Sequence, residues 1–239
     1  MTQATIAYSD AGVALKGFLA YNDNITGKRP GVLVMPEAFG LGKNAKVRVQ
    51  QLADLGYVAL GGDPYGDGRE FTDLQDAMKV AGALMADPAK FRARARAGLD
   101  KLASLPQVDS SRLAAIGYCM GGTFALELAR DGAPLRGVVS FHGGLQTQRP
   151  AVAGQVKAKV LVCHGSDDPL IAAAHVAGFI DEMTKARADW EMISYGNTVH
   201  SFTNPDADGT MMPGIKFNAQ SDARSWLAMR NFFDEIFAK

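Results

Sequence analysis

The sequence of 239 residues contains only two cysteines, Cys119 and Cys163, and they do not form a CxxC pair. This excludes a disulfide-stabilised secreted scaffold and makes a reducing, cytoplasmic environment the expectation. An excess of one charge is also lacking, because 25 Lys and Arg residues balance 25 Asp and Glu residues. Proteins that bind nucleic acid or anionic membranes usually carry a basic excess, so we expect neither partner.

Long hydrophobic runs are absent as well. The longest uncharged apolar stretch, residues 113–126, is interrupted by glycines and is too short to span a bilayer, so no transmembrane helix is predicted. The N-terminus lacks the basic segment, apolar core and small-residue cleavage site of a secretory signal. We therefore expect a soluble protein inside the cell.

Motifs for metals and nucleotides are missing too. No HExxH or paired-ligand spacing occurs, and the four histidines fall in separate segments. Neither GxGxxG nor the phosphate-binding GxxxxGKS or GxxxxGKT is present, and the segment 40–43 is interpreted as the turn before a helix. We expect no metal and no other cofactor.

Apolar runs of strand length alternate with longer helical patterns, which predicts a mostly parallel sheet with helices on both faces. The predicted strands are 4–8, 13–21, 31–36, 57–61, 112–118, 137–141, 159–164 and 191–195. The predicted helices are 44–55, 72–86, 88–104, 120–130, 169–187 and 219–238. The apolar stripe of the last helix is expected to be core, and the first two strands to form an antiparallel hairpin. No linker or repeat divides the chain, so one α/β domain over residues 1–239 is predicted.

The segment Gly117-Tyr118-Cys119-Met120-Gly121 lies between a predicted strand and a predicted helix. This is the G-x-nucleophile-x-G elbow with cysteine in place of serine, and its glycines allow a strained turn with close backbone packing. A helix N-terminus also favours a thiolate. Cys119 is therefore the predicted nucleophile, with a buried structural cysteine as the alternative.

The base and its orienting acid are expected in loops that follow later strands. His200 follows the last predicted strand, whereas His142, His164 and His175 are better explained as structural or pocket-lining residues. Asp168 fits a G-x-x-D-P turn after the preceding strand, while Asp167 is expected to cap the turn or face solvent. The order Cys119, Asp168, His200 is that of the α/β-hydrolase fold.

Other site residues are predicted from their positions at strand ends. The backbone N–H groups of Ala38 and Met120 are the expected oxyanion hole, and Glu37 brings a carboxylate near the elbow unless it is an ordinary loop acid. Ligands of parallel α/β sheets bind at these ends of the strands. The predicted substrate-binding residues, each of which could instead be edge packing, are Phe39, Tyr65, Tyr118, His142 and Phe202.

The segments 36–40, 117–122 and 200–202 and the Asp168 turn together resemble the dienelactone hydrolase family of cysteine-dependent α/β-hydrolases, over essentially the whole chain. In that family the glutamate matching Glu37 contacts the resting thiol and is displaced by substrate. The resemblance thus implies a thiolate that substrate triggers, which would limit oxidation of Cys119.

One departure from the family concerns its substrate-binding arginines. Dienelactone hydrolase has an arginine shortly after His-Ser-Phe, where this chain has Thr203-Asn204-Pro205, and no arginine lies between Arg69 and Arg92. Losing a bidentate donor weakens binding of an anionic lactone, so a small neutral ester or lactone is the expected substrate. The sharpest alternative is a metal-independent phosphotriesterase, to which the family is also similar. A ligand binder without turnover and a metallohydrolase are weaker alternatives, and the expected assembly is a monomer or a homodimer.

Overall fold

The structure is a computed structural model that describes residues 1–238, and the chain divides into two compact units, Met1–Ile116 and Gly117–Lys239. All eight predicted strands and all six predicted helices are present, with shifts at their ends. Apolar runs such as residues 32–35 and 160–163 form strands that are almost completely buried, as their composition predicts. The single-domain boundary remains a prediction of the sequence.

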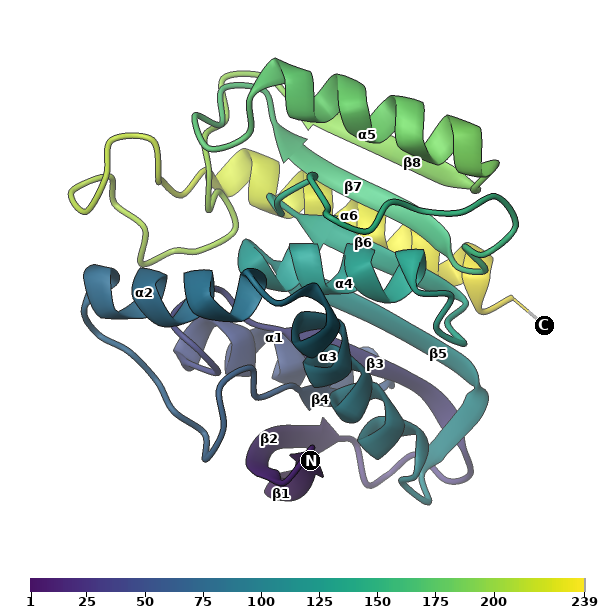
Figure 1. The fold of residues 1–239 in the computed structure, drawn as a ribbon. Helices are drawn as coiled ribbons and strands as arrows, with labels where there is room; N and C mark the ends of the chain where they lie inside the picture. The colour runs from purple at the N-terminus through teal and green to yellow at the C-terminus, as the bar shows by residue number, and fades with distance from the viewer. Residues whose placement is uncertain (239) are drawn as a thin grey trace. The chain divides into compact units, whose positions relative to one another are not determined.

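The first unit contains strands β1 to β4, most of β5 and three helices (Figure 1). Its strand order is β1-β2-β4-β3-β5. The hairpin of β1 and β2 is antiparallel, as predicted, and β3 pairs with β4 in parallel. Helices α1 and α3 pack on opposite faces of these strands (Figure 1). The bounds are β1 Thr2–Asp10, β2 Val13–Tyr21, β3 Arg29–Met35, α1 Lys43–Asp54, β4 Val58–Gly61, α2 Leu74–Met85, α3 Pro88–Ala103 and β5 Val108–Tyr118.

The second unit begins at the last two residues of β5 and contains three parallel strands in the order β6-β7-β8. Helices α4 and α5 lie on one face of these strands and α6 on the other (Figure 1). The stripe of α6 is core, as predicted, because Met229 and Phe233 are fully buried. The bounds are α4 Met120–Arg130, β6 Gly137–Phe141, β7 Lys159–Gly165, α5 Ala173–Ala186, β8 Trp190–Tyr195 and α6 Ala219–Ile236.

Helix α5 begins at Ala173, four residues later than the sequence predicts. The intervening residues form a turn around Asp168, whose side chain accepts the Leu170 N–H and whose carbonyl accepts the Ile171 N–H. These bonds replace the first turn of the predicted helix. The later start leaves the Asp168 carboxylate in a turn, off the helix surface.

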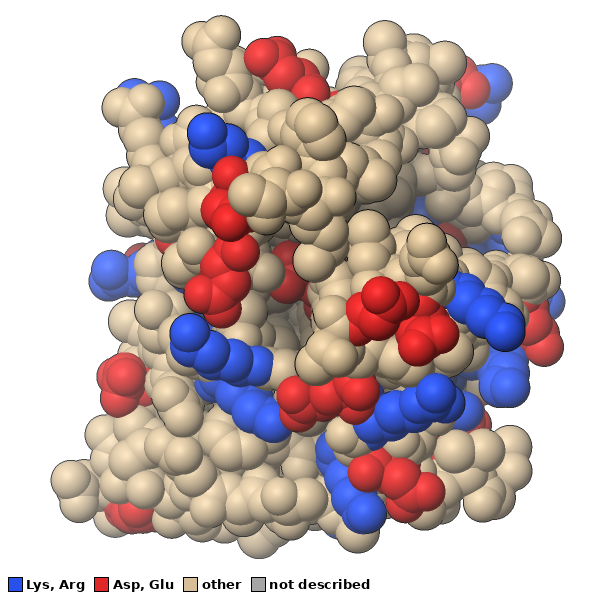
Figure 2. Space-filling model, turned by 90° about the vertical axis from the view of Figure 1, so that its left-hand side faces the viewer, with Lys and Arg blue, Asp and Glu red and all other residues tan. Residues whose placement is uncertain are grey.

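Positive and negative side chains are interspersed on the face drawn in Figure 2, and neither sign forms a large uninterrupted patch there. A continuous basic stripe is the electrostatic feature that attracts polyanions. This face therefore offers no such stripe.

No helix in residues 1–238 has both the length and the apolar character needed to cross a membrane. Within the same residues, no three or more His, Cys, Asp or Glu side chains cluster in a way that could hold a metal ion.

Candidate active site

Cys119 lies at a sharp turn between β5, which ends at Tyr118, and α4, which begins at Met120. Its backbone has φ 54° and ψ −119°, which residues other than glycine rarely adopt. The Cys119 N–H is shared between the Phe141 carbonyl at 3.0 Å and His142 Nδ1 at 3.1 Å. The turn is thus anchored to the end of β6, and it leaves the cysteine partly exposed.

The tight approach of the chain to itself explains the glycine two residues before Cys119. A Cβ atom on Gly117 would lie 1.9 Å from the Gly121 carbonyl oxygen and 2.1 Å from its carbon. Both atoms belong to the backbone, so no side-chain rotation could relieve the contact. The elbow pattern predicted from the sequence is therefore imposed by backbone packing across the first turn of α4.

His200 and Asp168 form a buried hydrogen-bonded pair. The distance between His200 Nδ1 and Asp168 Oδ2 is 2.8 Å, and their side chains are 3% and 0% exposed. Asp167 is exposed, and its carboxylate accepts the Ser166 hydroxyl at 2.6 Å. Of the two aspartates that the sequence offers, Asp168 is the one placed to orient the His200 ring.

The pKa of His200 is set by opposing effects. Burial favours the neutral ring, but the charge of Cys119 and the hydrogen bond with Asp168 outweigh burial and raise the pKa to about 10. The Nε2 atom is buried and, among residues 1–238, reaches no partner within ordinary hydrogen-bond geometry. Cys119 therefore acts on His200 chiefly through its charge.

This coupling predicts the titration of His200 in a variant without the thiol. In Cys119→Ala the charge that favours the protonated ring is removed, so we expect the His200 pKa to fall from about 10 toward the ordinary value of 6.5. At a pH between these two pKa values, the His200 ring is protonated in the unmodified protein and neutral in the variant. Nitrogen-15 NMR of the histidine rings across this pH range measures the difference. Identical titration curves in both proteins would contradict the coupling.

His142 lies beneath the elbow and has both ring nitrogens occupied. Its Nδ1 accepts the Cys119 N–H, so the ring proton is assigned to Nε2, which lies 2.8 Å from Thr203 Oγ1. The ring also meets the His200 ring edge to face, with centroids 5.1 Å apart. His142 is 1% exposed, and its two hydrogen bonds link the Cys119 turn to the segment that follows His200. The sequence suggested a structural or pocket-lining role and did not predict this link.

Two other predicted substrate-binding residues are packed in the interior of the second unit. Tyr118 is 1% exposed and stacks on Phe141 with ring centroids 4.8 Å apart. Phe202 is fully buried and contacts the His142 ring edge to face. In this structure both contribute packing around the elbow.

The remaining predicted residues belong to the first unit, in the segment after β3 and a neighbouring loop. Ala38 is 6% exposed, whereas Glu37, Phe39 and Tyr65 are partly exposed. The Tyr65 hydroxyl donates to the Ala38 carbonyl at 2.6 Å, and the Phe71 N–H donates to the Phe39 carbonyl at 2.9 Å. Tyr65 thus holds the loop that carries the predicted oxyanion donor.

Comparison with known proteins identifies the family. The model of the dienelactone hydrolase family matches residues 15–237. The chain belongs to the dienelactone hydrolase family. This confirms the family predicted from the sequence.

Solved structures similar to this family member support the same assignment. The structure named m3DLH is 46% identical, covers 99% of both chains and has a TM-score of 0.95. A dienelactone hydrolase-like promiscuous phosphotriesterase from metagenomic libraries is 44% identical, also covers 99% of both chains and has a TM-score of 0.94. The predicted α/β-hydrolase fold is confirmed.

A curated relative from a Bradyrhizobium species is named a probable 2-oxo-3-(5-oxofuran-2-ylidene)propanoate lactonase. It is 32% identical over 216 residues, which cover 84% of this chain and 86% of the relative. Together with the family assignment, these likenesses make this dienelactone hydrolase-family chain an ester hydrolase.

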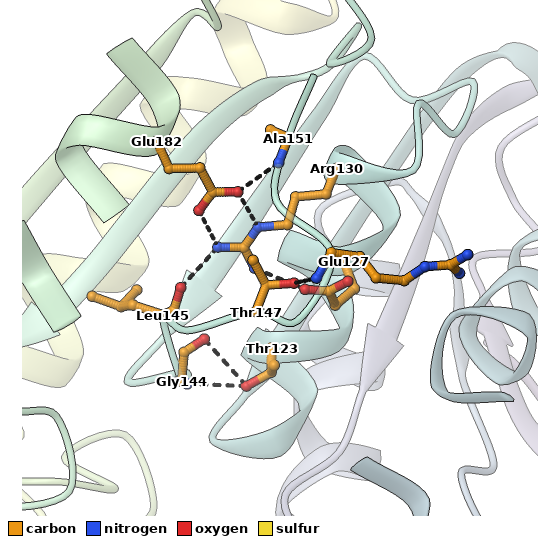
Figure 3. A network of polar contacts seen from close by, with 9 residues as sticks. Thr123, Glu127, Arg130, Gly144, Leu145, Thr147, Ala151 and Glu182 are labelled. Carbon is orange, nitrogen blue, oxygen red and sulfur yellow. Dashed lines mark hydrogen bonds and ion pairs between the residues drawn. The ribbon is translucent and has the colours of Figure 1, made fainter. Parts of the chain in front are cut away.

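A buried ion-pair network secures α4, the helix that follows Cys119 in this family member (Figure 3). Arg130, at the end of α4, donates through Nε and Nη2 to both carboxylate oxygens of Glu182 on α5, each at 2.8 Å. Its remaining donors reach Glu127 at 3.0 Å and the Leu145 carbonyl at 2.8 Å. At the other end of α4, Thr123 exchanges hydrogen bonds with the backbone of Gly144. The helix behind Cys119 is thereby held at both ends.

Removing the Arg130 side chain is expected to destabilise the fold strongly. In Arg130→Ala, Glu127 and Glu182 lose their cation in a buried site, so we expect the free energy of unfolding to fall by about 3 kcal/mol. Urea denaturation measures the change. The matched control is Lys185→Ala, which breaks an exposed pair with Asp181 on α5 and should cost less than about 0.5 kcal/mol. Equal effects of the two substitutions would contradict this assignment.

The second cysteine is chemically different from the first. Cys163 is fully buried in β7, and burial raises the pKa of its thiol to about 12, although the Tyr195 hydroxyl at 3.7 Å acts in the opposite sense. A thiol in this state is a poor nucleophile at neutral pH. Cys119 is therefore the cysteine available for chemistry.

Proposed function

We propose that the protein hydrolyses small neutral carboxylic esters or lactones with a triad of Cys119, His200 and Asp168. The observation that carries the proposal is the buried 2.8 Å bond between Asp168 and His200, on a ring whose pKa responds to the charge of Cys119. A partly exposed cysteine on a strained elbow and an oriented imidazole are the parts that nucleophilic catalysis requires. A protein that only binds a ligand needs none of them.

The reaction proceeds in two stages. The Cys119 thiolate attacks the carbonyl carbon, and the tetrahedral oxyanion is stabilised by backbone N–H groups, among them that of Met120 at the N-terminus of α4. His200 gives its proton to the departing alkoxide, which leaves an acyl-cysteine. His200 then takes a proton from water as the water attacks the acyl carbon, and the acid product leaves with the thiolate restored. Asp168 keeps the His200 ring in the required tautomer and stabilises its charge.

The proposal also gives roles to Glu37 and the Ala38 amide, and both roles are inferred from the sequence. The family resemblance implies that Glu37 controls the resting thiol and that Ala38 supplies the second oxyanion donor. The Tyr65 hydroxyl donates to the Ala38 carbonyl and so fixes the Ala38 loop within its own unit. This suits an oxyanion donor, which must be preorganised.

Neutral substrates are favoured by the segment after His200. Where dienelactone hydrolase carries an arginine for its substrate carboxylate, this chain has Thr203, which is fully buried with its hydroxyl on His142. Thr203 therefore supplies no charge to an anionic substrate. We accordingly propose a preference for uncharged esters and lactones.

Neutral phosphotriesters are the second candidate class. The observation in their favour is the 44% identity with a dienelactone hydrolase-like protein named a promiscuous phosphotriesterase. A thiolate and an oxyanion hole suit attack at phosphorus as well, because the developing phosphoryl oxygen needs similar donors. The same residues would then form a phospho-cysteine.

A substrate panel with detection of the covalent intermediate tests the proposal. The panel contains activated neutral carboxylic esters, neutral lactones, neutral phosphotriesters and a lactone carboxylate. We expect turnover of neutral compounds, unchanged by a chelator, and an acyl or phosphoryl mass increment that peptide mapping assigns to Cys119. Binding without product, or an increment on another residue, would refute the triad; preference for the lactone carboxylate would refute the substrate class.

A further inference from the structure

The segment after His200 returns to hold the backbone of the same histidine. The yellow-green loop in Figure 1 leaves β8, passes through residues 203–218 and leads into α6. On its way back, the Gly214 carbonyl accepts the His200 N–H at 3.0 Å, and the Lys216 N–H donates to the His200 carbonyl at 3.0 Å. His200 also forms an isolated parallel bridge with Ile215. Both backbone polar groups of the base are therefore bound to this one segment.

Gly214 lies against the turn that carries the acid. A Cβ atom at Gly214 would be 2.1 Å from Pro169 Cγ and 2.9 Å from Pro169 Cδ. Pro169 cannot move these atoms by rotating a side chain, because they belong to its ring. The φ of Gly214 is not positive, so its backbone conformation does not require glycine. The close approach of Pro169 does.

These contacts connect the base and the acid through a second route besides their side-chain bond. Pro169 directly follows Asp168, whose Oδ2 lies 2.8 Å from His200 Nδ1 and whose Oδ1 accepts the Leu170 N–H at 2.9 Å. The Gly214 carbonyl holds His200, while Pro169 occupies the space that a Cβ atom on Gly214 would need. The distance between Gly214 and Pro169 therefore sets how far apart the segments of His200 and Asp168 lie.

We propose that Gly214 is a positioning residue for the Asp168–His200 pair, which acts through its contact with Pro169. The inference rests on the proposed function, because it assigns a role within that triad. Adding a methyl group at position 214 forces the segments apart until the new carbon reaches an ordinary separation from Pro169, a movement on the order of 1 Å. Displacements of this size in catalytic groups lower rates by about 100-fold.

The test is a double-mutant cycle between positions 214 and 169. We expect Gly214→Ala to lower kcat for a neutral ester by about 10-fold to 100-fold with KM unchanged, because the base is displaced while the substrate contacts remain. In Pro169→Ala the Cγ and Cδ atoms are gone and the remaining Cβ would lie 3.4 Å from the new methyl group, an ordinary contact. The double variant should therefore have nearly the kcat of its Pro169→Ala parent.

A spectroscopic measurement separates this proposal from the proposed function. The low-field NMR signal of the His200 Nδ1 proton reports the bond to Asp168 and needs no turnover. We expect this signal to shift or broaden in Gly214→Ala and to return in the double variant. If Cys119→Ala retains turnover the triad is wrong, whereas an unperturbed Nδ1 signal in Gly214→Ala refutes the positioning role alone.

The matched control is Gly196→Ala, which adds the same methyl group before His200 at a site with no atom within 4 Å. It should leave kcat and the NMR signal unchanged. Full activity of Gly214→Ala overturns the proposal, and so does a loss that Pro169→Ala fails to rescue. Should the single variant not fold, the double variant decides: folded and active supports the contact, unfolded or inactive refutes it.

Discussion

Cys119→Ala is expected to lower kcat/KM for an activated neutral ester by a factor on the order of 1,000 or more. The variant loses the atom that forms the covalent intermediate, and Cys163 cannot replace it because that thiol is buried and its pKa is raised to about 12. Steady-state kinetics of the purified variant measure the effect. Intact-mass analysis of the same sample should show no acyl adduct.

His200→Ala should cause a loss of similar size, because without the imidazole neither the alkoxide nor the attacking water exchanges its proton. Residues that act as one unit are not additive, so the double variant should be scarcely slower than either single one. Activity that survives in both single variants would refute the assignment of nucleophile and base. Circular dichroism of each variant verifies that the fold is retained.

Gly117→Ala is expected to destabilise the fold by at least about 4 kcal/mol, a size that severe overpacking of buried structure can reach. The added carbon would lie 1.9 Å and 2.1 Å from backbone atoms of Gly121, so either β5 or the first turn of α4 must move. Any folded fraction should also be inactive, because this movement displaces Cys119. Urea denaturation measures the loss of stability.

The control for Gly117→Ala is Gly178→Ala in α5, where nothing lies within 4 Å of the added carbon. Alanine favours the helix at such a site, so the control should be neutral or more stable by up to about 1 kcal/mol. A Gly117 variant as stable as the control would show that the elbow tolerates a side chain. It would remove the packing argument for the glycine.

Local patterns predicted the parts of this molecule that depend on neighbouring residues. Continuous apolar runs located the buried strands, and a strand followed by G-x-C-x-G located the elbow. Each of these patterns is confined to a few consecutive residues. The order of Cys119, Asp168 and His200 then distinguished Asp168 and His200 as partners, and the structure brings these two within 2.8 Å.

Contacts between distant segments were not predictable in this way. The bond from the Cys119 amide to His142 spans 23 positions, and that from His142 to Thr203 spans 61. Gly214 follows Pro213 in a stretch that reads as an ordinary loop, and nothing nearby in the sequence indicates Pro169 as its neighbour. The late start of α5 has a local origin, since the Asp168 turn competes with the helix for the backbone N–H groups of Leu170 and Ile171.

The contrast between the two cysteines allows the functional molecules in a preparation to be counted. Both thiols are free, but only Cys119 is accessible in the folded chain. A thiol-specific reagent should therefore be consumed at one equivalent per native chain and at two after denaturation. The native reading divided by the difference between the two readings gives the fraction of chains whose Cys119 is intact, so rates can be expressed per intact Cys119 for any substrate.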